Sequence, residues 1–147
     1  MAPARRLLVL RRLVPIPEAL VAEVVAEVSS RMKDPAYAQV AIGAFIEAHP
    51  EASRFVALKM TARGGAEAAM HALFHAQVVA ECIARHRGVE ALAPLRFADL
   101  DAVAEDARGA GLAAAEPALA GYLQSNIDEA KTAGVIAHLA LALARPA

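Results

Sequence analysis

Residues 66–87 read AEAAMHALFHAQVVAECIARHR, and this stretch decides the fold of the chain. It contains neither Pro nor Gly, it lies between Gly65 and Gly88, and most of its residues have a high helix propensity. At about 100° per residue, a helix over this stretch carries two apolar rows. The first row contains Ala69, Leu73, Ala76, Ala80 and Ile83, and the second contains Met70, Phe74, Val78 and Cys82. Because a surface helix normally has one apolar stripe, two rows predict a helix buried at the centre of a bundle.

Proline and glycine residues divide the preceding sequence into three more helices. Residues 17–33 have the pattern of an amphipathic helix, with Pro at the first position. Asp34 and Pro35 suit the N-cap and the first position of a second helix, which is expected to end at residue 49. A third helix is expected over residues 50–63, because the two glycines that follow stop it. A short turn there predicts that it runs antiparallel to the central helix.

The sequence after residue 88 predicts shorter helices followed by a long apolar one. Asp99 or Asp101 is expected to cap a helix that ends near residue 108. Pro117 marks the start of the next helix. The last helix either begins at a cap formed by Asp128 or continues from the helix before it, and its apolar residues cover more than one face.

The chain is expected to be all-α, with a single-domain helical bundle of six or seven helices in residues 17–147 and an N-terminal arm in residues 1–16. The arm carries two Arg pairs around four apolar residues, and prolines separate it from the domain. It either folds over its own core or docks on a second subunit. Gly43 lies inside the second helix, where Gly costs about 1 kcal/mol relative to Ala, so it predicts a close helix crossing.

Composition limits the function classes that fit this chain. Its formal net charge of −1 gives no electrostatic reason to expect nucleic acid or an anionic membrane. Residues 133–144, the longest late apolar run, are shorter than the ~20 residues of a membrane span. The hydrophobic content of 58% suits a helical protein with a buried subunit interface. The single cysteine, Cys82, excludes an intrachain disulfide and is typical of a cytoplasmic protein.

His71 and His75 form the most suggestive chemical motif. Histidines at i and i+4 project from one helix face and can both bind a metal ion such as zinc. Glu67 lies one turn earlier on the same side and is a further candidate ligand. The alternative is that both histidines are hydrogen-bonded in a polar seam between helices. The HExxH motif is absent because Ala72 follows His71.

No other pattern predicts catalysis. Cys82 has apolar neighbours and lies near the C-terminal end of its helix, and both features raise the pKa of a thiol. We therefore expect no catalytic residues, and the sequence favours a non-enzymatic role over an enzymatic one. An apolar ligand pocket is conceivable where the small alanines leave space among larger side chains. The candidates for its lining are Phe45, Phe55, Met70 and Phe74.

Three functions are consistent with these patterns. The first is a non-enzymatic interaction domain that homodimerises through its apolar helix faces, without a cofactor. The second is a small-molecule binder with an apolar pocket between helices. The third is a metal-binding bundle that uses His71 and His75. The sequence favours the first, because surplus apolar surface is its strongest signal.

Overall fold

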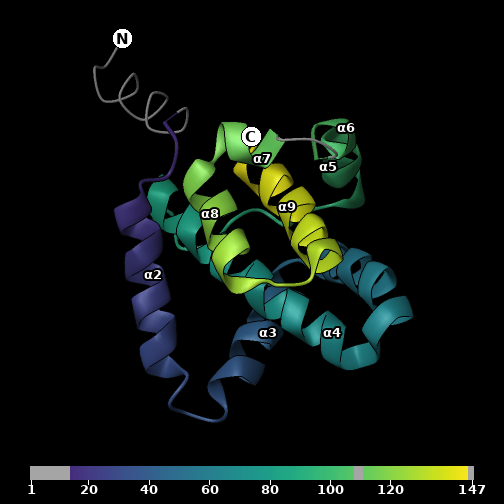
Figure 1. Cartoon of the computed structure of the whole chain (residues 1–147), viewed down its shortest axis with the longest axis horizontal. Helices are drawn as coiled ribbons and strands as arrows, with labels where there is room; N and C mark the ends of the chain where they lie inside the picture. The colour runs from purple at the N-terminus through teal and green to yellow at the C-terminus, as the bar shows by residue number, and fades with distance from the viewer. Residues whose placement is uncertain (1–13, 108–110, 146–147) are drawn as a thin grey trace.

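The computed structural model describes residues 14–107 and 111–145, which contain helices and no strands (Figure 1). The helices are α2 (Glu18–Arg31), α3 (Tyr37–Ala48), α4 (Pro50–Arg87), α5 (Phe97–Ala102), α6 (Ala104–Ala107), α7 (Gly111–Ala115), α8 (Pro117–Asn126) and α9 (Ala130–Ala144). The predicted all-α, single-domain bundle is confirmed. The helix expected near residues 99–108 divides into α5 and α6, and α7 was not expected. The predicted arm lies largely in residues 1–13, outside the described part of the chain.

Helix α4 consists of two helical arms joined at Gly65. This residue has φ 69° and ψ −157°, a backbone conformation that is essentially confined to glycine. The ribbon of α4 turns back at this bend (Figure 1). Met60 and His71 consequently line the same surface hollow, although a straight helix would separate them by about 16 Å along its axis. The expected interruption at the glycine pair is therefore a sharp bend.

The second arm of α4 is the centre of the bundle, as the two apolar rows predict. Helices α2, α3 and α9 all pack on α4. Ten apolar residues of this arm are buried: Ala69, Ala72, Leu73, Ala76, Val78, Val79, Ala80, Cys82, Ile83 and Ala84. The second apolar row is buried only in part, because Phe74 is half-buried and Met70 is 43% exposed. That row therefore becomes accessible as it approaches the Gly65 bend.

Three helix caps differ from the expected ones. α5 is capped by Arg96, whose backbone N–H donates to the Asp99 carboxylate. α3 begins at Tyr37, with Ala36 at the N-cap position, while the Asp34 carboxylate accepts a hydrogen bond from the Ala36 backbone N–H in the preceding turn. α9 is capped by Glu129 and not by Asp128. The Glu129 carboxylate accepts hydrogen bonds from the backbone N–H groups of the second and third residues that follow it.

The residues just before α2 are hydrogen-bonded to side chains that are distant in the sequence. The side chain of Ile16 is buried, and its backbone N–H donates to the Glu116 carboxylate at 2.8 Å. The backbone carbonyl of Val14 lies 2.8 Å from Nε2 of His86, at the end of α4. These contacts fix the position at which the chain enters α2.

Within residues 14–107 and 111–145, no helix is long and apolar enough to cross a membrane. This agrees with the expectation from residues 133–144.

Candidate functional site

His71 and His75 lie side by side on α4, as their spacing predicts. Their ring centroids are 4.6 Å apart, and the rings meet edge to face. His71 is exposed, whereas His75 is buried and its Nδ1 lies 2.7 Å from the Tyr122 hydroxyl of α8. The pKa of His75 is lowered from its ordinary 6.5 to about 4, mainly by burial and secondarily by the charge of His71. His71 is therefore the exposed member of the pair, and His75 is a neutral imidazole in the core.

Glu67 and His71 line a surface hollow of about 590 Å³ together with Glu129 of α9. Among the residues that the structure describes, no three His, Cys, Asp or Glu side chains form a group that could hold a metal ion. His75 uses one ring nitrogen for Tyr122, which leaves the other as its single possible ligand atom. Zinc binding by His71, His75 and Glu67 stays a prediction, in which the two histidines are the main ligands.

Cys82 is buried on the inner face of α4. Burial raises the pKa of its thiol to about 12. A thiol that stays protonated is a poor nucleophile and a poor metal ligand. This agrees with the expectation that Cys82 packs in the core.

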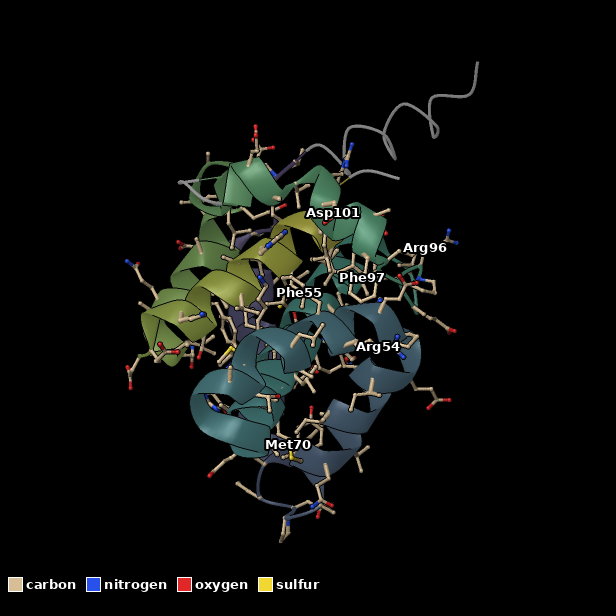
Figure 2. The ribbon with its side chains drawn as sticks, turned by 90° about the vertical axis from the view of Figure 1, so that its right-hand side faces the viewer. Arg54, Phe55, Met70, Arg96, Phe97 and Asp101 are labelled. Carbon is tan, nitrogen blue, oxygen red and sulfur yellow. The ribbon has the colours of Figure 1, made fainter. Side chains whose placement is uncertain are left out.

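The four apolar pocket candidates do not converge. Phe45 is fully buried against the ring of His49. Phe55 meets the ring of His138 edge to face at a centroid distance of 5.2 Å. Met70 lies on the surface, well away from Phe55 (Figure 2). Of these side chains, only Phe74 lines the groove described next.

A groove lies between α2 and α3, with the second arm of α4 as its floor. Both helices pack on α4, but they make at most marginal contact with each other. The apolar part of the lining comprises Val24, Val28, Val40, Ala41, Ala44, Phe74 and Val78. Its hollow has a volume of about 170 Å³, close to the roughly 150 Å³ of a cavity that holds a benzene ring. The groove can therefore take up one or two apolar side chains of a partner.

Carboxylates surround the end of the groove where α2 meets the C-terminal part of α4. Arg85 donates to Glu27 of α2 and, at 3.0 Å, to Glu81 of its own helix, and Glu23 lies 4.0 Å away. The hydrogen bond from Arg85 lowers the pKa of Glu27. Hydrogen bonds to Glu27 and Glu81 raise the pKa of Arg85, so Arg85 and Glu27 are both charged at neutral pH. Three carboxylates share one guanidinium, which leaves this end acidic.

The outward face of α3 continues the apolar surface beyond the groove. Val40 is 66% exposed and Ile46 is 44% exposed. Gly43 and Ala44 lie exposed between them, and a Cβ atom added at Gly43 would meet no atom within 4 Å. The close helix crossing expected at Gly43 is therefore not present among the described residues. The glycine instead faces open space on an apolar surface.

Sequence reasoning missed the groove and two buried polar contacts. The groove depends on the separation of α2 and α3, which no local pattern encodes. Buried His49 accepts a hydrogen bond from the backbone N–H of Leu95 at 2.9 Å and so holds the connection before α5. Its position before Pro50 suggested only a helix boundary. The Tyr122 partner of His75 also lacked a signal in the sequence.

Comparisons of the chain with protein-family models, with curated proteins and with solved structures find no match. What the chain does is therefore inferred from the groove, the exposed face of α3 and the histidine pair.

Proposed function

We propose that this chain is a non-enzymatic interaction domain that homodimerises through the outward face of α3 and the adjoining groove. The observation that carries the proposal is the apolar surface that lines the groove at Phe74 and Val40 and reappears beyond Gly43 at Ile46, which no part of the described chain covers. Contiguous exposed apolar surface is a common feature of protein-interaction sites. The low net charge supports a protein partner over nucleic acid, and the single cysteine supports a reducing compartment such as the cytoplasm.

A second copy is the partner that the face of α3 fits best, because this face is complementary to itself. In two α3 helices that cross antiparallel at Gly43, Val40 of one copy and Ile46 of the other lie at the same level and flank the crossing point. The same two-fold relation places Gln39, an amide donor, at the level of the Glu47 carboxylate. Antiparallel crossing also opposes the helix dipoles. Exposed Gly43 and Ala44 allow the two backbones to approach closely.

Analytical ultracentrifugation over a dilution series tests the dimer. We expect the wild-type chain to be dimeric at micromolar concentration, and the variants Val40→Glu and Gly43→Glu to be monomeric because each places a carboxylate in the contact. Leu58→Glu is the matched control, since Leu58 is 70% exposed on the first arm of α4 and does not line the groove. A wild-type monomer at high micromolar concentration contradicts the proposal, as does a Val40→Glu variant that dimerises as well as Leu58→Glu.

The matched substitution Gly43→Ala separates dimerisation from stability. A methyl group at this position meets no atom of the described residues within 4 Å, so Ala is expected to stabilise the helix by about 1 kcal/mol. The same methyl group holds two crossing α3 backbones apart and weakens the dimer. An unchanged dimer constant for Gly43→Ala removes the close crossing from the proposal.

A further inference from the structure

We propose that residues 4–13 of the second copy fill the α2–α3–α4 groove of the first, so that each copy completes the binding surface of the other. This inference rests on the proposed homodimer and names what occupies its groove. Residues 4–13 read ARRLLVLRRL and lie outside the described part of the chain.

The face of α3 alone is too small for a stable dimer. A 12-residue helix is about 18 Å long and 10 Å wide, so one face offers roughly 200 Å². Stable interfaces bury about 800 Å² per partner. More surface must therefore come from the groove, and a flat face cannot enter it. A narrow segment with large apolar side chains can.

Residues 4–13 match the groove in chemistry. Leu7, Leu8, Val9 and Leu10 form an apolar centre, and the groove floor offers Val24, Val28 and Phe74. Arg pairs lie on both sides of that centre. The carboxylates around Arg85 leave a net charge of −2 at one end of the groove, from three Glu and one Arg, and Arg31 at the other end offsets one of these charges. Arginine in this position gains carboxylate partners without burying its charge.

The segment also matches the groove in length. Along α4 the lining runs from Phe74 to Arg85, which corresponds to about 16 Å of helix. Ten residues span about 15 Å as a helix and about 33 Å when fully extended. The segment can therefore cover the groove in either conformation.

The path of the chain before α2 favours the groove of the partner over the chain's own. The contacts of Val14 with His86 and of Ile16 with Glu116 fix this path at the N-terminal end of α2. Residues 14–17 leave α2 in the direction away from α3 (Figure 1). Val14 and Ile16 each precede a proline, which restricts both to extended conformations and opposes a tight reversal. A segment that continues in this direction leads away from the chain's own α3.

Paramagnetic broadening in the full-length chain tests the inference. Leu8→Cys introduces one reactive thiol for a nitroxide label, because Cys82 is buried and its thiol stays protonated. Labelled, ¹⁴N protein is mixed with unlabelled, ¹⁵N protein, so that only contacts between copies are detected. We expect broadening of the amide signals of Val24, Val28 and Val40 of the ¹⁵N copy. Adding Val40→Glu to the ¹⁵N copy is expected to remove the broadening, and adding Leu58→Glu is expected to preserve it.

Light scattering on the same mixture separates the two proposals. If the protein is a dimer but no broadening between copies is seen at the groove, the proposal that residues 4–13 occupy the partner's groove is rejected and the proposed homodimer is retained. Broadening only when the label and ¹⁵N are in one chain assigns the groove to the chain's own segment and overturns the inference. A monomer rejects the homodimer itself. The double variant Arg11→Glu/Arg12→Glu is expected to raise the dimer dissociation constant by about tenfold, and an unchanged constant contradicts the role of the carboxylates.

Discussion

The hydroxyl oxygen of Tyr122 lies 2.7 Å from Nδ1 of His75, and this hydrogen bond joins α8 to the central arm of α4. Both side chains are buried, so neither group exchanges its partner for water. The contact also orients His75 beneath His71, with which its ring is in edge-to-face contact. It is a buried polar link in a core that is otherwise almost entirely apolar.

Tyr122→Phe is expected to destabilise the fold by about 1–3 kcal/mol, because it leaves a buried imidazole nitrogen without a partner. Urea denaturation followed by circular dichroism measures the loss. Tyr37→Phe is the matched control: Tyr37 is half-buried, and its ring meets Phe74 edge to face, with no hydrogen bond from its hydroxyl in the described structure. Equal effects of the two substitutions would show that the His75 contact contributes nothing specific.

Stability is expected to fall as the pH drops from about 6.5 to about 4, because His75 takes up its proton more readily in the unfolded chain than in the folded one. The lowered pKa in the folded state means that the unfolded chain binds more protons within this window. A full shift from 6.5 to about 4 corresponds to a loss of roughly 3 kcal/mol, and the dependence levels off below pH 4.

Free energies of unfolding at several pH values, for the wild type and for His75→Gln, measure this contribution. The variant is expected to lose less stability between pH 6.5 and 4. It is not expected to become independent of pH, because burial also lowers the pKa of His49 and acts in the same direction. Parallel pH profiles for the two proteins would rule out His75 as a source of the dependence.

Gly65→Ala is expected to destabilise the fold by about 1–3 kcal/mol, because residue 65 has a positive φ that only glycine adopts without strain. Gly43→Ala provides the contrast, since Gly43 lies in an ordinary helix with open space around it. Thermal denaturation of the two variants under one set of conditions gives the comparison. A Gly65→Ala variant as stable as the wild type would mean that the α4 bend does not need this backbone conformation.

Cys82 is expected to be unreactive in the folded protein, because its thiol is buried and its pKa is raised to about 12. Ellman's reagent should modify it only at the rate of unfolding and completely in denaturant. Leu58→Cys supplies an exposed thiol as the internal standard. Rapid modification of Cys82 in the native protein would contradict the packing of α4 on its neighbours.

The central helix was predictable because its signal is local. Leu73 and Val78 lie on different sides of residues 66–87, so their burial could be read from periodicity alone. Met70 departs from that pattern because it lies near the bend, where the neighbouring helices no longer cover α4. Glu129 replaces Asp128 as the cap of α9 because the cap is set by where the preceding loop ends, which helix propensity does not determine.

The candidate site was predictable only in part, because its remaining contacts join distant parts of the chain. The i, i+4 spacing placed His71 beside His75, but Tyr122 lies 47 residues further on. The groove likewise exists because α2 and α3 pack on α4 while staying apart from each other. Such a separation follows from the packing of the whole bundle and cannot be predicted from the sequence of any single segment.

Two consecutive residues at the end of α4 hold both ends of the described chain. Nε2 of His86 contacts the Val14 carbonyl, and the Arg87 guanidinium donates to the Arg145 carbonyl at 3.0 Å. Val14 and Arg145 therefore lie at one pole of the molecule, and the α2–α3 turn lies at the opposite pole (Figure 1). A short peptide linking the two ends, with the chain reopened at that turn, would make a circular permutant that preserves α2 through α9.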